Sequence, residues 1–145
     1  MDYIKEAIEQ LRDYTLMIVA VATMQEQLEA LKLEKDNIKA QVITREPRGG
    51  GSTEPDDKIA NNIFKRKVII NNIVATNKKI KCIDKSLAQL GTDEQKVLNR
   101  MFIIGCNNAI NDLSRELNIS KSQIYRIKEQ AIRRFARAMF GVGFV

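Results

Sequence analysis

Neither proline nor glycine occurs between Asp2 and Thr44, and this uninterrupted stretch limits the fold more than any other feature of the chain. Its apolar residues recur at alternating steps of three and four, the heptad spacing of helices that pack along a seam. The stripe consists of Tyr3, Ala7, Gln10, Tyr14, Met17, Val21, Met24, Leu28, Leu31, Lys35, Ile38 and Val42. We therefore expect one long helix with at least one partner helix. The run Leu16–Ala22 is apolar nearly all round, which favours a bundle or an oligomer over a lone helix.

A second long helical pattern extends from about Pro55 to Leu90. Between the two patterns, residues 45–55 contain two prolines and three consecutive glycines, which is typical of a flexible connector. Matched lengths and a short connector predict an antiparallel, coiled-coil-like helical hairpin over residues 1–90. Asn77 and Asp84 fall on its seam, where buried polar residues would fix the register. The expected stripe of the second helix is Ile59, Ile63, Ile70, Ile73, Asn77, Ile80, Asp84 and Leu87, widened by Ile69, Ile83 and Leu90.

Residues 91–145 have the signals of three shorter helices, near 92–104, 108–117 and 120–140. Thr92 and Gln95 predict a capping box at the start of the first helix, and Gly105 predicts its end. Its buried face would hold Val97, Leu98, Met101 and Phe102. The second helix would bury Ile110, Leu113 and Leu117, which are spaced at helical steps. The fold class expected for the whole chain is all-α.

The stretch Asn107–Gly141 has the pattern of a helix-turn-helix. Asn118 lies where the chain must pass through a left-handed conformation, which asparagine tolerates better than most residues. Ser120 follows as the cap of the last helix, with Gln123 completing a capping box. The last helix would bury Ile124, Ile127, Ala131 and Phe135. An ordinary helical hairpin with a solvated basic face is the alternative interpretation of this pattern.

The side of the last helix that faces away from this apolar stripe is rich in basic residues. Between Ser120 and Phe140 there are six basic residues and one acid, Glu129, which favours an anionic partner such as nucleic acid. A recognition helix spanning 120–137 would present its first turns to the edges of bases in a major groove. The residues expected to contact bases are Lys121, Ser122, Gln123, Tyr125 and Arg126. Arg133, Arg134 and Arg137 come later on the helix, where phosphate contacts are expected.

Composition excludes several classes of function. The 145 residues carry a formal net charge of +6 and include no histidine, so a histidine base is excluded. Cys82 and Cys106 lie far apart without metal-ligand spacing, and we expect free thiols in a reducing cytosol. There is no recognisable catalytic motif, so we expect neither an enzyme nor a cofactor. The polar N-terminus and the short apolar runs predict a cytoplasmic protein without a signal peptide or a membrane span.

The segment from residue 87 to residue 135 resembles region 4 of sigma-70-type transcription factors. The shared pattern consists of Leu87 and Leu90, Glu94, Val97 and Leu98, Arg100 and Phe102, Ile119 and Ser120, and Ile124, Ile127 and Ala131. This resemblance implies a three-helix DNA-binding domain over residues 91–145. A long helical hairpin joined to such an end is similar to small late-gene regulators of Gram-positive phages and prophages, the autolysin-regulator (ArpU-like) and RinA-like groups.

The resemblance also implies particular contacts with DNA. It assigns base edges to the first turns of the last helix, as the spacing does, and backbone contacts to the start of the helix before it. The phosphate contacts expected on this basis are Asn107, Asn108, Lys128, Arg133, Arg134 and Arg137. Ser114 departs from the family pattern, which usually has glycine or alanine where the two helices cross.

These observations predict a sequence-specific, double-stranded DNA-binding transcription regulator of phage or prophage late genes. The hairpin would join two chains into a homodimer or dock on RNA polymerase, and no membrane partner is expected. One alternative is a recognition subunit for DNA packaging, similar to phage small terminases, which also combine a helix-turn-helix with a coiled oligomerisation segment. Another is a sigma-like module that binds RNA polymerase and never touches DNA.

Overall fold

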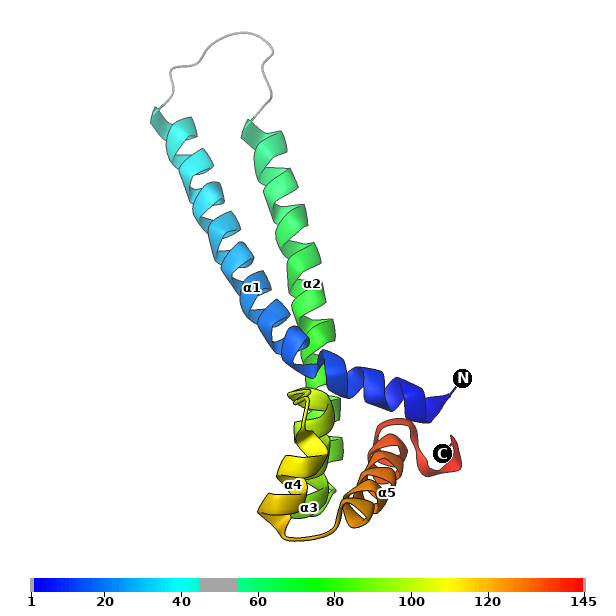
Figure 1. Cartoon of the computed structure of the whole chain (residues 1–145). Helices are drawn as coiled ribbons and strands as arrows, with labels where there is room; N and C mark the ends of the chain where they lie inside the picture. Colours follow the sequence, from blue (N-terminus) through cyan, green and yellow to red (C-terminus); the bar gives the residue numbers. More distant parts are fainter. Residues whose placement is uncertain (1, 45–54, 145) are drawn as a thin grey trace. The chain divides into compact units, whose positions relative to one another are not determined.

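The computed structural model describes residues 2–44 and 55–144, and those residues form helices and turns without any strand. This confirms the predicted all-α class. Most of the predicted connector, residues 45–54, lies outside the described residues. The helices are α1 (Tyr3–Thr44), α2 (Pro55–Ala88), α3 (Thr92–Leu98), a π-helical continuation η1 (Asn99–Ile103), α4 (Ala109–Leu117), α5 (Lys121–Phe140) and a short 3-10 turn η2 (Val142–Phe144) (Figure 1).

The chain is divided into two compact units, and both long helices contribute to both of them. The two-helix unit comprises Val19–Asn77, and the core unit comprises Met1–Ile18 together with Lys78–Val145. Each unit is a set of residues that lie close to one another in space. The sequence places a different boundary near residue 90, between a helical hairpin and a DNA-binding domain. That functional division stays a prediction.

In the two-helix unit, segments of α1 and α2 run alongside each other in opposite directions (Figure 1). The heptad positions of α1 from Val21 to Ile38 are all half-buried, whereas the residues between them are exposed. The seam of α2 passes through Ile59, Ile63, Ile69 and Ile73, which are half-buried as well. The spacing in the sequence therefore identified the inward face of α1 correctly, because a heptad repeat keeps one face of a helix turned to its neighbour.

Two details of the α2 seam differ from the sequence prediction. Ile70 is 44% exposed, and the stripe passes through its neighbour Ile69 instead. The polar residue that the seam buries is Asn62, which is 3% exposed, whereas Asn77 is only half-buried and Asp84 is exposed. The side-chain amide of Asn62 donates to the carbonyl oxygen of Leu31 across the seam at 2.8 Å. The observed seam keeps the three-and-four spacing but lies one residue earlier than predicted at these positions, with Ile69 and Ile83 in place of Ile70 and Asp84, which explains both differences.

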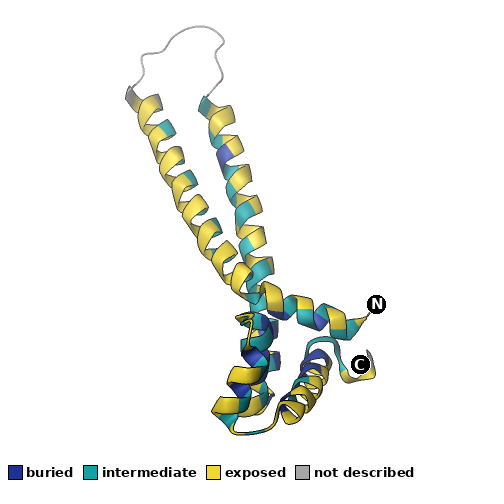
Figure 2. Ribbon diagram, viewed as in Figure 1, coloured by how far each residue is buried: buried dark blue, intermediate teal, exposed yellow. Residues whose placement is uncertain are grey.

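The core unit contains every buried apolar side chain among the described residues (Figure 2). The first turns of α1 pack there against the end of α2, the end of α3 with η1, and the second half of α5. Asp2 begins α1, because its carboxylate accepts hydrogen bonds from the backbone N–H groups of Ile4 and Lys5. The largest cluster consists of Ala7, Leu11, Ile83, Leu90, Leu98, Phe102, Ala131, Ile132, Phe135 and Ala136. At its edge the rings of Tyr3 and Phe140 lie 5.3 Å apart.

The junction between α2 and α3 is capped differently from the prediction. Gly91 occupies the N-cap of α3, and its backbone N–H donates to the Glu94 carboxylate at 3.4 Å. Thr92 is already the first helical residue, so the predicted Thr92–Gln95 capping box is wrong. The Gln95 amide instead donates to the carbonyl oxygens of Leu87 and Leu90, at 2.9 and 3.0 Å. These bonds satisfy carbonyl groups that the end of a helix leaves without partners.

Candidate nucleic-acid interface

Helices α4 and α5 pack on a small apolar cluster of their own within the core unit. Its fully buried members are Val97 of α3, Leu113 of α4 and Ile124 of α5. Half-buried side chains surround these three: Met101, Ile110, Leu117, Ile119 and Ile127. Because each of the three helices contributes one side chain to the centre, the cluster fixes the angle of α5 against its neighbours.

The turn between α4 and α5 is held by hydrogen bonds as well as by packing. Asn118 adopts the predicted left-handed conformation, with φ 54° and ψ 46°. The Ser114 hydroxyl donates to the carbonyl oxygen of Ile119 at 2.6 Å, and the Ile119 N–H donates to the carbonyl oxygen of Ser114 at 3.2 Å. Ser114 thus closes the turn from within α4, a role that the sequence analysis missed. A serine four residues before a left-handed asparagine is the signal that was available.

The predicted capping box at the start of α5 is confirmed. The backbone N–H of Gln123 donates to the Ser120 hydroxyl, and the backbone N–H of Ser120 donates to the Gln123 side-chain oxygen, both at 3.2 Å. The first turn of α5 is therefore fixed at two points by groups of the chain itself. The Gln123 side chain is partly committed to this cap.

The residues expected to contact bases share one exposed surface on the first two turns of α5. Tyr125 is 51% exposed although it is aromatic, and its ring lies 5.8 Å from the ammonium group of half-buried Lys128. The other members are also exposed, namely Lys121, Ser122, Gln123 and Arg126. We call this set the α5 front. The helical repeat brings these residues together because the opposite side of α5 carries Ile124, Ile127 and Ala131 into the core.

A hollow of about 360 Å³ separates the start of α4 from the first turn of α5. Lys121 and Tyr125 of the α5 front line it on one side, and Asn107 and Asn108 line it on the other. Both asparagines are exposed, and Asn108 occupies the N-cap of α4 without a side-chain capping bond. Backbone N–H groups at the start of a helix and a lysine together favour a negatively charged group in such a place. The structure thus brings two predicted phosphate-contact residues next to two predicted base-contact residues.

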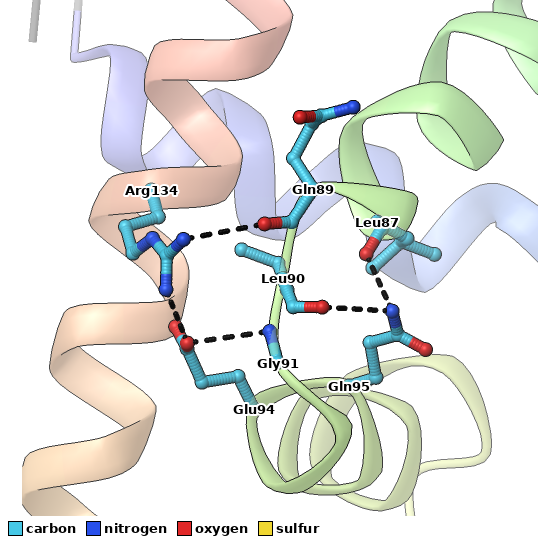
Figure 3. Close-up of polar contacts among 7 residues, drawn as sticks. All are labelled: Leu87, Gln89, Leu90, Gly91, Glu94, Gln95 and Arg134. Carbon is cyan, nitrogen blue, oxygen red and sulfur yellow. Dashed lines mark hydrogen bonds and ion pairs between the residues drawn. The ribbon is translucent and has the colours of Figure 1, made fainter.

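The remaining predicted phosphate contacts lie further along α5. Arg133 and Arg137 are exposed. Arg134 is engaged within the protein: its guanidinium group donates to the Glu94 carboxylate of α3 and to the backbone carbonyl oxygen of Gln89 (Figure 3). Glu94 also accepts from the Gly91 N–H, so one carboxylate and one guanidinium group join α5 to the α2–α3 junction. We call these residues the Arg134 latch.

A second ion pair ties α4 to the segment before it. Glu116 of α4 accepts from Arg100 of η1 and lies 4.0 Å from the ammonium group of Lys96. Arg100 therefore neutralises an acid on α4. Within α5, in contrast, the only acid is Glu129, one turn beyond Tyr125. The electrostatic balance of α5 favours an anionic partner along its exposed side.

Other kinds of site find no support in the part of the chain that the structure describes. Within residues 2–44 and 55–144, no group of acidic and cysteine side chains is arranged to hold a metal ion. Over the same residues, no helix combines the length and the apolar character needed to cross a membrane. Cys82 and Cys106 are both free thiols.

No protein-family model matches this chain, and comparisons with curated proteins and with solved structures yield no match either. The geometry of α4 and α5 is therefore the basis for assigning a function.

Proposed function

We propose that this protein is a sequence-specific, double-stranded DNA-binding transcription regulator. In this proposal α4 and α5 form a helix-turn-helix within a three-helix end that resembles region 4 of sigma factors, and the α5 front enters the major groove. The observation that carries the proposal is the exposure of Lys121, Tyr125 and Arg126 on a helix whose opposite side is buried. An ordinary solvated helix requires neither an exposed tyrosine between basic residues nor a preceding turn that is fixed by three hydrogen bonds.

The contacts fall into two groups by chemistry. Arginine and lysine can donate to guanine O6 and N7, and serine and tyrosine hydroxyl groups can bond several base edges, so the α5 front selects sequence. Asn107, Asn108, Lys128, Arg133 and Arg137 would bind the phosphate backbone and supply affinity for any duplex. Because Arg134 is held in its latch, we assign it mainly to the positioning of α5.

The biological setting is inferred only from the resemblance of the sequence to sigma region 4 and to phage late-gene regulators. Joined to a long helical hairpin, a sigma-like end of this kind suits a late-gene regulator of a phage or prophage. A homodimer through the hairpin would present two recognition helices to half-sites about one helical turn apart. RNA polymerase is the second partner that we propose.

The test begins with selection of bound duplexes from a random-sequence library by the full-length protein. Binding of a selected duplex and of a shuffled duplex is then followed by fluorescence anisotropy at about 50 and 200 mM salt. We expect affinity for both duplexes to fall with salt, and Arg126→Ala to reduce the preference for the selected duplex by roughly 1–3 kcal/mol.

Two matched variants separate sequence selection from general affinity. Arg133→Ala should weaken binding to both duplexes to a similar degree, because a phosphate contact carries no sequence information. Arg12→Ala removes an arginine from α1 and should leave the affinity for both duplexes unchanged. Arg12 lies over the ring of Phe102 in the core unit and is not part of the α5 front. Unchanged preference in Arg126→Ala would show that the α5 front is wrongly assigned. Absence of salt-dependent binding to any duplex would leave the protein-binding alternative.

A further inference from the structure

The exposed side of α5 carries a single acid, Glu129, among its basic residues. A shallow hollow of about 480 Å³ on this helix is lined by Tyr125, Arg126, Glu129, Gln130 and Arg133, so these side chains border one space. In a view down the helix axis, the position of Glu129 falls between those of Tyr125 and Arg126. Glu129 therefore continues the surface that holds the last two residues of the α5 front.

The Glu129 carboxylate is not engaged inside the protein. Glu94 and Glu116 of the same unit pair with Arg134 and Arg100, whereas no hydrogen bond or ion pair of Glu129 is found among the described residues. Arginines stand three residues before it and four residues after it, at the spacings that allow ion pairs along a helix. The carboxylate is nevertheless unpaired, and it is available to a partner from outside the chain.

An acid on a surface that approaches DNA has two opposite effects on binding. It weakens the affinity for every duplex, because it repels the phosphate groups. In the major groove it gains a hydrogen bond only from the amino group of cytosine or adenine, since guanine and thymine present acceptors there. Cytosine N4 is the amino group that acidic side chains contact in known complexes. A glutamate in this place therefore lowers general affinity and contributes to the selection of sequence.

We propose that Glu129 accepts a hydrogen bond from the N4 amino group of a cytosine and so specifies one base pair of the binding site. This inference rests on the proposed function and extends the base-reading surface by one turn beyond the α5 front. In one class of helix-turn-helix domain, bases are read by residues three, four and seven positions after the first base-reading residue. The same steps lead here from Ser122 to Tyr125, Arg126 and Glu129.

Arg126 and Glu129 should read neighbouring base pairs. They are three residues apart, which is about 4.5 Å along a helix, and neighbouring base pairs are about 3.4 Å apart. Arginine donates to guanine O6 and N7, whereas glutamate accepts from cytosine N4, so the two side chains require opposite patterns of donors and acceptors. The binding site should therefore contain a cytosine beside the guanine that Arg126 contacts.

The experiment measures binding of the full chain to the selected duplex and to duplexes in which one base pair at a time is replaced, by fluorescence anisotropy. For the natural chain, replacing the cytosine by thymine should raise the dissociation constant on the order of tenfold. Glu129→Gln should move the preference at that base pair from cytosine to adenine, because an amide group pairs with adenine N6 and N7. Glu129→Ala should remove this preference and bind a shuffled duplex about twofold more tightly, because the repulsion of phosphates is gone.

Glu9→Gln is the matched control, because it removes one negative charge from an exposed position of α1 in the same unit. It should leave the preference at every base pair unchanged. A Glu129→Gln protein with the preferences of the natural chain overturns the inference. So does a change confined to the guanine that Arg126 reads, because Glu129 would then only position Arg126. In both cases salt-dependent binding of DNA persists, whereas a natural chain that binds no duplex overturns the proposed function itself.

Discussion

Helix α1 passes through both units, and its two parts share one heptad repeat but not one depth of burial. In the core unit Ala7 is fully buried, whereas Leu28 of the two-helix unit occupies the equivalent heptad position and is only half-buried. Leu11, which follows the predicted stripe position Gln10, is fully buried as well. The difference arises from the neighbours. The first turns of α1 lie among α2, α3 and α5, while among the described residues the later turns have α2 as their one neighbouring helix. A heptad repeat thus specifies the inward face of a helix without specifying how many helices cover it.

The comparison also separates two kinds of polar contact. The Arg134 latch of the core unit joins α5 to the α2–α3 junction through partly exposed groups, and the buried Asn62 of the two-helix unit leaves its side-chain oxygen without a partner. Stability should therefore come mainly from apolar packing in the core unit, while the two-helix unit depends on what covers it.

The largest effect is expected from the same substitution at two positions of α1. Leu11→Ala should lower the free energy of unfolding of the core unit by about 3 kcal/mol, because it leaves a cavity among fully buried neighbours. Leu28→Ala should cost about 1 kcal/mol in the two-helix unit, since less apolar surface is lost there. Urea unfolding followed by circular dichroism measures both. Equal costs at the two positions would remove the distinction between the units.

A smaller effect of opposite sign is expected at Asn62. Asn62→Leu removes a buried oxygen that has no hydrogen-bond partner, so it should stabilise the two-helix unit by about 1 kcal/mol. The same change should loosen the register of α1 against α2, because the amide of Asn62 bonds the Leu31 carbonyl. Asn61→Leu is the matched control at an exposed neighbour and should alter stability little. Thermal unfolding and hydrogen exchange at Leu31 report the two effects, and a destabilised Asn62→Leu protein contradicts the account.

The Arg134 latch should contribute about as much as one partly exposed ion pair. Arg134→Ala should lower stability by roughly 1 kcal/mol, because it removes a pairing with Glu94 and a bond to the Gln89 carbonyl. Arg133→Ala should leave the free energy of unfolding unchanged and weaken the binding of DNA. Comparing unfolding with duplex binding for the two neighbours separates the positioning role from the phosphate role, and equal stability of both variants would show that the latch holds nothing.

The sequence determined more about α4 and α5 than about the packing of α1. Local signals specify the turn at Asn118 and the cap at Ser120, since their causes lie within a few residues of one another. The packing of Leu11 against α5 has no local signal, because the α5 members of its cluster, from Ala131 to Ala136, are more than a hundred residues away in the chain. The heptad pattern pairs α1 with α2 and gives no indication of this further partner.

The candidate site shows the same division between local and distant causes. Helical periodicity was sufficient to predict that Tyr125 and Arg126 are exposed together. It could not distinguish Arg134 from Arg133, because Arg134 reaches Glu94 only after α3 has folded against α5. The role of Ser114 required the geometry of the turn, in which its hydroxyl reaches the Ile119 carbonyl.

The smallest expected effect is a pH dependence at Tyr14, which lies on the α1 stripe at the edge of the core unit. Its hydroxyl donates to the Asp84 carboxylate at 2.6 Å, and this bond, with burial and the charge of Asp84, raises the pKa of Tyr14 from 10.0 to about 12. Between these values the unfolded chain releases a proton that the folded chain retains. The contribution is therefore complete below pH 10 and is lost as the pH rises towards 12.

Tyr14→Phe removes that contribution, so its free energy of unfolding should fall less steeply with pH over this range than that of the natural chain. Urea unfolding at several pH values between 9 and 12 measures the slope. Tyr125→Phe leaves the bond between Tyr14 and Asp84 in place and should keep the steeper slope of the natural chain. Because Tyr14 is only half-buried, solvent screens its bond to Asp84 and the effect is modest beside that of Leu11→Ala. Identical slopes for Tyr14→Phe and the natural chain would mean that Asp84 does not hold the Tyr14 proton in solution.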